Sequence, residues 1–360
     1  MAVAFGRNIK VDIYGASHAE KIGVIIEGLP SGLEVDLEKL QEFMNRRAPG
    51  NNPWSTPRKE ADVPEIISGL TDGKTDGSAL EAVIYNRNIK PGDYGNVLSV
   101  PRPGHADYTS WIKYGRIETG GGKWSGRMTA PLCIAGGIVM QFMEKRGINI
   151  SAHIYEIGGV TDDSVRELLE EQMRGRLNDK DIRNLSIGEF PTISDSKGQL
   201  MMDKIAEARS RGDSIGGHIE CVITGMPAGV GDALFGGIES RLSQAVFAVP
   251  AVKAIEFGEV KMYGSDNNDA FCIRDGRVET RTNNHGGILG GISSGMPIIF
   301  CVKIKPTPSI AMEQDSVDLV SMESAKIAVR GRHDPCIVPR AVPCIEAAAA
   351  IAIYDMLLGE

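Results

Sequence analysis

Apolar positions along the chain switch between a two-residue period, which predicts strands, and a longer period, which predicts helices. Residues 9–14 and 22–27 show the first pattern on either side of a Gly-Ala-Ser-His turn at 15–18. Residues 36–47 show the second pattern, and Asp36 stands where a helix N-cap is expected. The first fifty residues therefore predict two strands joined by a tight turn and followed by a helix.

The rest of the chain alternates between short strand-like stretches and longer helix-like stretches. The stretch at 131–146 is apolar nearly all round, which predicts a helix buried on every side. Residues 48–64 contain four prolines and predict an irregular loop. Strands are further expected at 65–70, 79–86, 150–157 and 298–304, and helices at 163–177, 200–211 and 341–358.

Two separate stretches, residues 23–44 and 216–242, share one order of elements: a strand, a Gly-apolar-Pro-small-Gly turn and a helix. A duplicated unit would give two sheets related by pseudo-symmetry, and chance similarity between two such turns is the alternative. Strand-rich segments that come in pairs favour an α+β fold with two sheets over alternating βαβ units. No clean linker interrupts the chain, so we expect one domain over residues 1–360.

Charge and cysteine content exclude several classes of partner. The net charge of −8 and the lack of a basic, aromatic-rich patch argue against nucleic acid. Six cysteines stand singly, with no Cys-x-x-Cys pair and no metal-ligand spacing, which favours reduced thiols in a cytoplasmic protein without a metal. The N-terminus has no apolar signal core, and the longest apolar runs are too short to span a membrane.

The stretch from Arg102 to Ala130 concentrates candidate chemistry. It contains His105, Asp107, several cations and three consecutive glycines at 120–122, and it leads directly into the apolar helix. Glycine lets backbone N–H groups approach a ligand closely, and a helix N-terminus favours anions. We therefore predict a ligand-binding loop here, and a flexible surface loop is the alternative.

Titratable side chains elsewhere add further candidates. His18 and His105 follow tight turns and could act as general acids, because imidazole titrates near neutral pH. His153 lies within a strand pattern, where a structural role is expected. Residues 330–340 hold three arginines, whose planar guanidiniums suit phosphate and carboxylate groups, and the Lys-Pro-Thr-Pro-Ser stretch at 305–309 could hold a phosphate or be a plain turn. Neither a P-loop nor a dinucleotide-binding fingerprint is present.

Taken in order, these stretches resemble the chorismate synthase family over residues 5–358. Each motif is weak alone, but the order and spacing are highly specific. The motifs are Gly-x-Ser-His at 15–18, Arg-Pro-Gly-His-Ala-Asp at 102–107, Gly-Gly-Gly-Lys-x-Ser at 120–125, Gly-Asp-Ser-Ile-Gly-Gly at 212–217, Pro-Ala-Val-Lys at 250–253, Thr-Asn-Asn-x-Gly-Gly-Ile-Leu-Gly-Gly-Ile-Ser at 282–293, Lys-Pro-Thr-Pro-Ser at 305–309 and Gly-Arg-His-Asp-Pro-Cys at 331–336.

The resemblance implies a lyase of the shikimate pathway, which leads to the aromatic amino acids. Such an enzyme converts 5-enolpyruvylshikimate 3-phosphate to chorismate and phosphate by a 1,4-elimination that needs reduced FMN. The resemblance further implies a homotetramer and a sandwich in which helices lie between two antiparallel sheets. Whether NADPH reduces the flavin on this protein stays open, and the lack of a reductase-like segment favours an outside source.

Specific residues take their implied roles from the same resemblance. His105 would protonate the departing phosphate, His18 would protonate the reduced flavin, and Asp334 would assist proton removal. Substrate contacts are implied for Arg47, Arg127 and Arg340. Flavin contacts are implied for Lys123, Trp124, Ser125, Pro250, Ala251, Gly290, Lys305, Pro306, Thr307, Pro308, Ser309 and Arg332.

This chain departs from the family pattern at several positions. The family's Gly-Glu-Ser-His-Gly reads Gly-Ala-Ser-His-Ala at 15–19, and Arg-Gly-Gly-Gly-Arg-Ser-Ser reads Thr-Gly-Gly-Gly-Lys-Trp-Ser at 119–125. An arginine is also replaced near Pro53. Lysine cannot make the planar fork contact of arginine, so we expect activity with altered flavin or substrate affinity.

Two other functions compete with the lyase. The departures raise the alternative of a homologue that binds flavin and anions without turnover. A true flavin oxidoreductase is the second alternative, and it would consume reducing equivalents with each product.

Overall fold

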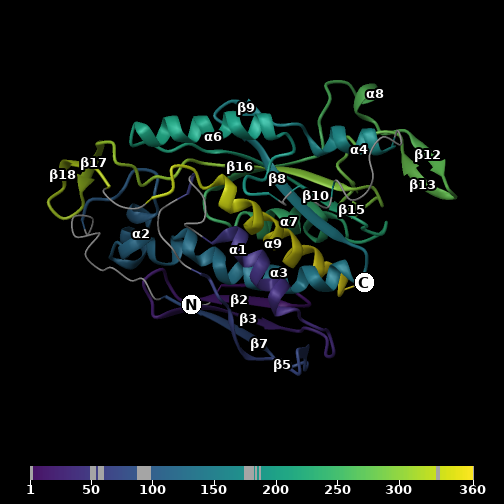
Figure 1. The fold of residues 1–360 in the computed structure, drawn as a ribbon, viewed down its shortest axis with the longest axis horizontal. Coiled ribbons are helices and arrows are strands. Elements are labelled where there is room, and N and C mark those ends of the chain that lie inside the picture. The colour runs from purple at the N-terminus through teal and green to yellow at the C-terminus, as the bar shows by residue number, and fades with distance from the viewer. Residues whose placement is uncertain are drawn as a thin grey trace.

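The structure is a computed structural model that describes residues 3–48, 54–55, 61–86, 99–173, 182, 185, 188–329 and 333–359. Two five-stranded sheets face one another across a layer of helices (Figure 1). This arrangement buries one face of each sheet and nearly all sides of the helices between them.

The first sheet is built from the N-terminal part of the chain, and all its neighbouring strands are antiparallel. Along the central strand, Ile22, Val24 and Ile26 are fully buried against the helices. The strand order is β1 (Val3–Phe5), β2 (Lys10–Tyr14), β3 (Lys21–Glu27), β7 (Leu80–Tyr85) and β4 (Glu65–Ser68).

The second sheet is also antiparallel throughout. Its central strand pairs on both sides over most of its length. The strand order is β11 (Val252–Phe257), β16 (Ile298–Ile304), β10 (Gly217–Thr224), β8 (Asn149–Ile157) and β9 (Val160–Thr161).

Four helices fill the space between the sheets, and two more lie on the outer side of the second sheet (Figure 1). The inner helices include two of the most apolar segments of the chain. The inner helices are α1 (Leu37–Arg47), α3 (Thr129–Glu144), α7 (Ile238–Val246) and α9 (Val338–Leu357), and the outer ones are α4 (Val165–Met173) and α6 (Asp195–Ser210).

Helices α3 and α9 run side by side at the centre of the core. A Cβ atom added to Gly136 would lie 2.3 Å from Ala347, so only glycine allows this approach. Phe142 and Tyr354, further along the same two helices, have ring centroids 5.8 Å apart. Both contacts join residues about 211 positions apart, so the two helices run parallel.

Helix α1 shows how local sequence positions Arg47, a predicted substrate contact. The Asp36 carboxylate accepts a hydrogen bond from the backbone N–H of Lys39 at 3.0 Å, as an N-cap does. Leu40 and Met44 are fully buried, and the helix ends at Arg47 because Ala48 takes an extended conformation. Arg47 therefore stands at the end of a helix whose position the core fixes.

Shorter elements complete the described part of the chain. Helix α2 (Asp107–Tyr114) and the 3-10 turns η2 (Thr119–Trp124) and η3 (Gly126–Met128) lie before α3. The others are η4 (Leu234–Gly236), α8 (Gly264–Asn267), and the two-stranded pairs β5 (Leu70–Thr71) with β6 (Lys74–Thr75), β12 (Phe271–Arg274) with β13 (Arg277–Thr280), β14 (Ile288–Leu289) with β15 (Ile292–Ser293), and β17 (Gln314–Asp318) with β18 (Glu323–Ile327).

The predicted α+β fold with helices between two antiparallel sheets is confirmed. The two stretches predicted to be copies occupy equivalent places, since β3 and β10 are both central strands and lead through Gly-x-Pro turns to α1 and α7. The sequence patterns missed β11, the hairpins and α2. Within the described residues, no helix is long and apolar enough to cross a membrane.

Candidate functional site

A cavity of about 530 Å³ opens where three helix ends meet: the C-terminus of α1 and the N-termini of α3 and α9. Helix N-termini carry partial positive charge and unpaired N–H groups, which favours anions. The lining residues fall within stretches that are far apart in the sequence: 17, 47, 102–129, 247–251, 305–309 and 333–344.

The cavity wall is strongly cationic although the chain as a whole is acidic. Asp334 is the only carboxylate among its described lining residues. Six cations line it: Arg47, Arg102, Lys123, Arg127, Lys305 and Arg340.

Asp62, behind the wall, holds two of the arginines in place. Arg47 and Arg127 each donate from Nη1 to a different oxygen of this buried carboxylate. Burial favours the neutral acid, but the two guanidiniums outweigh it and lower the pKa of Asp62. Arg47 also donates from Nε to the Thr129 hydroxyl at 3.1 Å. The guanidiniums are thus fixed at the cavity wall before any ligand arrives.

Arg340 joins this group from the first turn of α9. Its Nε donates to the backbone carbonyl of Arg47 at 3.1 Å, and its Nη1 lies 2.5 Å from the Asp334 carboxylate. The contact with Arg47 ties the start of α9 to the end of α1. Two predicted substrate contacts and the predicted proton acceptor therefore lie side by side.

His105 stands in a network that fixes its orientation. Its Nδ1 lies 2.6 Å from Asp107 Oδ1, and Arg102 donates to both oxygens of Asp107 at 2.7 and 2.8 Å. Burial raises the pKa of Asp107, but the hydrogen bonds from Arg102 and His105 reverse this and the net shift is strongly downward. An ionised Asp107 accepts the Nδ1 proton, so Nε2 is the atom of His105 that can exchange a proton with a ligand.

The glycine turn packs against both histidines. Gly120, Gly121 and Gly122 all have positive φ, and a Cβ on Gly120 would lie 1.9 Å from the His18 ring. A Cβ on Gly121 would lie 3.2 Å from Nε2 of His105. The triple glycine therefore leaves room for the two imidazoles, which is a steric reason for this sequence.

His18 lies just behind the cavity wall that Ser17 and Gly120 form. Ser17 Oγ donates to the Gly120 carbonyl at 3.2 Å and lies 3.0 Å from His18 Nδ1. Because the single hydroxyl proton is used on Gly120, the Ser17 oxygen accepts the Nδ1 proton of His18. This arrangement assigns the exchangeable position of His18 to Nε2.

Lys123, one of the departures from the family pattern, sits in an aromatic setting. Its Nζ lies 3.8 Å from the centroid of the Tyr114 ring and 4.8 Å from that of Trp124. The two aromatic rings thus hold the ammonium through cation–π contacts at the cavity edge.

The opposite wall comes from two stretches that meet at β11 and β16. Ala251 has a φ of 75°, which is uncommon for a residue with a side chain, and its carbonyl accepts from the Lys305 N–H at 3.0 Å. Lys305 donates from Nζ to the Gly104 carbonyl, and burial together with nearby Lys253 lowers its pKa.

Thr307 Oγ1 is buried without a hydrogen-bond partner among the described residues, which marks a place for a ligand atom.

The cavity brings together most of the residues that the sequence singled out. Pro306 and Gly290 are not among its lining residues. Gly290 lies in the β14–β15 turn near the N-terminus of α7, roughly 14 Å of helix away from the cavity at the other end of α7. Arg332 lies outside the described residues. The predicted residues that line the cavity are Arg47, His105, Lys123, Trp124, Ser125, Arg127, Pro250, Ala251, Lys305, Thr307, Pro308, Ser309, Asp334 and Arg340.

Sequence reasoning assigned no role to three further residues of the site, although Asp107 was noted in the candidate binding loop. Arg102 and Asp107 stood in a quoted motif, where the His-x-Asp spacing was the available signal. Asp62 lies in the Pro-rich stretch that was assigned to an irregular loop, and nothing in the sequence marked it. Its backbone has a φ of 45°, which is uncommon for a residue with a side chain.

The fold and the cavity together indicate a class: an enzyme that acts on a small molecule and has a cationic cavity lined by helix ends and clustered arginines. The comparisons with known proteins agree. The family model described as chorismate synthase matches residues 9–358, and the chain belongs to the chorismate synthase family. It is therefore an enzyme, a carbon–oxygen lyase.

Individual relatives share nearly the whole chain. "Chorismate synthase" of Lancefieldella parvula is 46% identical over 368 residues, covering 99% of this chain and 96% of the relative. "Chorismate synthase" of Methanococcoides burtonii is 38% identical over 359 residues, covering 98% and 95%. A crystal structure of chorismate synthase superposes with a TM-score of 0.74 at 26% identity, over 99% of this chain and 93% of that one.

Proposed function

We propose that the cavity binds 5-enolpyruvylshikimate 3-phosphate beside reduced FMN and eliminates phosphate to give chorismate. The observation that carries this proposal is the surplus of positive charge around the cavity, with an oriented imidazole in its wall: six lining cations meet one lining carboxylate, Asp334, and two carboxylates behind the wall, Asp62 and Asp107. In this reaction the C3–O bond to phosphate breaks and a proton leaves C6 of the same ring.

The residues present fit a flavin. The buried Thr307 hydroxyl lacks a partner among the described residues, and Ala251, in a left-handed backbone conformation, lines the same cavity. Lys123–Ser125, Pro250–Ala251 and Lys305–Ser309 would hold the FMN. Reduced FMN, when bound, supplies electron density to a substrate ring that has no carbonyl to acidify the departing proton.

Arg47, Arg127 and Arg340 would bind the phosphate and the two carboxylates of the substrate. Each charge-assisted hydrogen bond contributes about 1.5–3 kcal/mol, and several are needed to hold a polyanion on an acidic protein. Asp62 already fixes two of these guanidiniums, so little conformational entropy is lost when the substrate binds.

His105 would donate the proton that neutralises the departing phosphate. Asp107 accepts the Nδ1 proton and holds the ring still, so Nε2 presents its proton to the cavity. A positioned acid of this kind typically accelerates a reaction about 10²–10⁴-fold.

His18 would hold a second proton, at Nε2, on the side of the glycine turn where the flavin is proposed to lie. The Ser17 hydroxyl fixes its ring through Nδ1. Asp334 would assist the removal of the C6 proton, and its contact with Arg340 holds it beside the proposed substrate site.

We also propose a cellular location, an oligomeric state and a source of reduced flavin. A cytoplasmic homotetramer that takes its reduced flavin from an outside source is our proposal, on the family resemblance. Gly290 would reach a flavin only across a subunit boundary, because it lies far from the cavity of its own chain.

A homologue that binds flavin without turnover is the second candidate. The observation in its favour is Lys123, which is held between two aromatic rings in place of the arginine of the family pattern. This cation is available to a phosphate as a point charge only, without a planar fork.

One assay separates these functions. Purified protein is mixed anaerobically with chemically reduced FMN and 5-enolpyruvylshikimate 3-phosphate, and phosphate, chorismate and reduced flavin are measured. The lyase predicts one phosphate for each chorismate with no net consumption of reduced flavin. Flavin binding without phosphate release would support the silent homologue, and consumption of reducing equivalents with product would support an oxidoreductase.

A further inference from the structure

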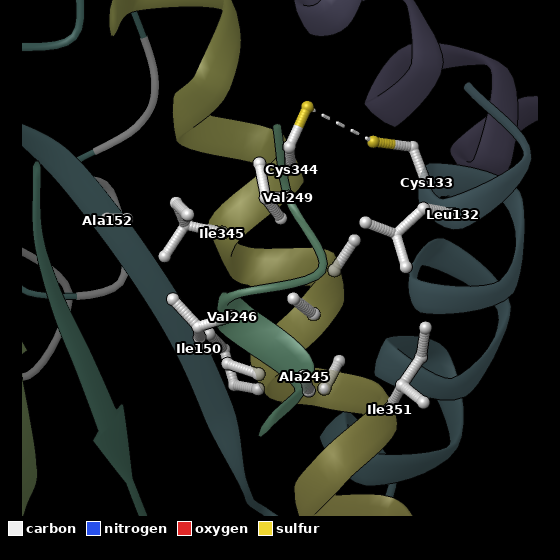
Figure 2. Packing of buried hydrophobic residues seen from close by; sticks show 14 of the residues in the cluster. Leu132, Cys133, Ile150, Ala152, Ala245, Val246, Val249, Cys344, Ile345 and Ile351 are labelled. Atoms are coloured by element: carbon white, nitrogen blue, oxygen red, sulfur yellow. Dashed lines mark hydrogen bonds between the residues drawn. The ribbon is translucent and has the colours of Figure 1, made fainter. Parts of the chain in front are cut away.

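A pair of cysteines lies at the base of the cavity. Cys344, on α9, lines the cavity, and its Sγ lies 3.8 Å from the Sγ of Cys133 on α3. Figure 2 shows the two sulfurs pointing toward one another from neighbouring helices. Cys133 is fully buried behind Cys344 and is not a lining residue, so a reagent in the cavity reaches Cys344 first.

The close packing of α3 and α9 holds this pair together. One helical turn beyond the cysteines, Gly136 and Ala347 bring the two backbones into direct contact. Both cysteines stand three residues before these two positions, on the same faces of the parallel helices. The pair is thus part of the rigid core, and its two sulfurs cannot drift apart without disturbing the helix contact.

The surroundings divide the two thiols into a nucleophile and its partner. The Cys133 thiol donates to Cys344 Sγ, and this contact, with Arg47 and Arg340 nearby, lowers the pKa of Cys344. Burial raises the pKa of Cys133 well above its usual value. The thiolate is the reactive form of cysteine, so the cavity-facing member of the pair is the reactive one.

We propose that Cys344 and Cys133 form a redox-active dithiol, which hydrogen peroxide entering the cavity converts to a disulfide. The Cys344 thiolate attacks one peroxide oxygen, the O–O bond breaks, and a sulfenic acid and hydroxide form. The Cys133 sulfur then attacks Cys344 sulfur, the S–O bond breaks, and water leaves with the Cys133 proton. Two electrons pass from the two thiols to one peroxide, and a dithiol reductant later reduces the disulfide back to two thiols.

The disulfide would change the cavity wall. A sulfur–sulfur bond is about 2.05 Å long, so the Cys344 sulfur, now 3.8 Å from that of Cys133, must move closer to it. In its thiol form that sulfur donates to the Arg340 carbonyl at 3.3 Å, and this bond is lost on oxidation. Arg340 also donates to the Arg47 carbonyl, so oxidation removes a main-chain contact directly beside a cation of the wall. We expect oxidation to raise the KM for an anionic substrate about three- to tenfold and reductant to restore it.

The test uses the full chain, treated with increasing hydrogen peroxide, alkylated, digested and analysed by mass spectrometry. We expect a cross-linked peptide pair containing Cys133 and Cys344 that has lost two hydrogens and disappears with reductant. Cys336 is a matched control, because it is buried near the start of α9 and burial raises its pKa to about 12. A Cys336→Ala variant should form the cross-link as the parent does.

Variants of the second cysteine complete the test. In Cys133→Ala, Cys344 should stop at sulfenic acid or proceed to sulfinic acid without a cross-link, and Cys133→Ser serves the same purpose if the first variant does not fold. Sulfinic acid on Cys344 of the parent protein without any cross-link would overturn the proposal. So would oxidation of Cys344 no faster than that of Cys336. These readouts need no turnover, so they stand apart from the outcome of the lyase assay.

Discussion

Two buried ionic clusters of this protein, one at the cavity and one behind the second sheet, combine carboxylates with basic side chains in opposite proportions. At the cavity, Asp62 stands between Arg47 and Arg127. Behind the second sheet, His153 lies between two carboxylates, with Nδ1 3.2 Å from Asp162 and Nε2 3.0 Å from Glu220.

The cluster behind the second sheet, formed by His153, Asp162 and Glu220, is here called the sealed cluster, and its charges are paired within the protein. Glu220 also accepts from the Val165 N–H at 2.6 Å, and Asp162 accepts from the backbone at Ile193 and Ser194. His153 is fully buried, and its contacts agree with the structural role expected from its strand. The hydrogen bonds of this cluster are used within the protein, and none is directed to the cavity.

The cavity cluster keeps a surplus of positive charge. Several guanidiniums meet one buried carboxylate, and the remaining positive charge faces an open volume. Buried charge is costly unless it is paired, so a fold that keeps unbalanced cations beside a cavity is built for an anionic ligand. The excess of positive charge at the cavity, which the sealed cluster lacks, therefore indicates a binding site. Substitutions of single residues can test this difference.

The largest effect is expected from His105. His105→Ala removes the oriented acid and should lower kcat about 10²–10⁴-fold, because the departing phosphate loses its proton donor. Phosphate release in the anaerobic assay measures this. His153→Gln should leave kcat within about twofold, because the sealed cluster faces no ligand. Equal losses of kcat in the two variants would remove the distinction between the clusters.

The next largest effect is expected from Asp62, whose substitution should lower the free energy of unfolding. Asp62→Asn leaves two buried guanidiniums without their carboxylate, which should cost about 3–5 kcal/mol of unfolding free energy. Chemical denaturation measures the change. Asp72 is a matched control, because it is exposed and has the same left-handed backbone, with φ values of 51° and 45° for Asp72 and Asp62. Asp72→Asn should change stability by less than about 0.5 kcal/mol.

The sealed cluster should make the stability of the protein depend on pH. Burial alone would lower the pKa of His153, but hydrogen bonds to Asp162 and Glu220 outweigh it and the pKa is raised. The folded state therefore binds this proton more tightly than the unfolded chain, whose His pKa is about 6.5. The stabilisation is complete below that pH and is lost as the pH rises through the folded-state pKa.

Denaturation curves at several pH values test this. Stability of the parent should fall as the pH rises above about 6.5, and His153→Gln should be less stable at low pH with a flatter profile. His218 offers a contrast of opposite sign, because burial lowers its pKa and its contribution is lost as the pH falls. A parent profile that rises from neutral to alkaline pH would contradict the assignment.

The smallest effect is expected from Lys123. Lys123→Met removes one point charge at the cavity edge and should raise the KM for substrate about tenfold, whereas Lys123→Arg should stay within about threefold of the parent. Lys113 is a matched control, because its Nζ also lies over the Tyr114 ring, at 5.6 Å, but it does not line the cavity. Steady-state kinetics should show no change in Lys113→Met.

The sequence predicted those features whose causes are local. Asp36 caps its helix as the pattern indicated, and α3 is buried all round because its apolar residues cover every face. The His-x-Asp spacing at 105–107 was a local signal for the hydrogen bond between His105 and Asp107, although the sequence patterns predicted neither this bond nor α2. The triple glycine marked a close approach, although its specific purpose, room for His18 and His105, needed the fold.

Features that depend on distant contacts were not readable from the chain. Asp62 has no motif of its own, and its importance comes entirely from two arginines that are 15 and 65 residues away. Cys133 and Cys344 look like isolated core thiols until the parallel packing of α3 and α9 joins them. The short hairpins were missed because strands of two to five residues are too short for a period to stand out.

The central claim is that the cationic cavity holds substrate and flavin together, and a crystal structure with both bound tests it most directly. The account predicts FMN against Lys123–Ser125 and Lys305–Ser309, with the substrate phosphate within hydrogen-bond distance of His105 Nε2. A structure with the ligands bound elsewhere, or with His105 turned away from the phosphate, would contradict it.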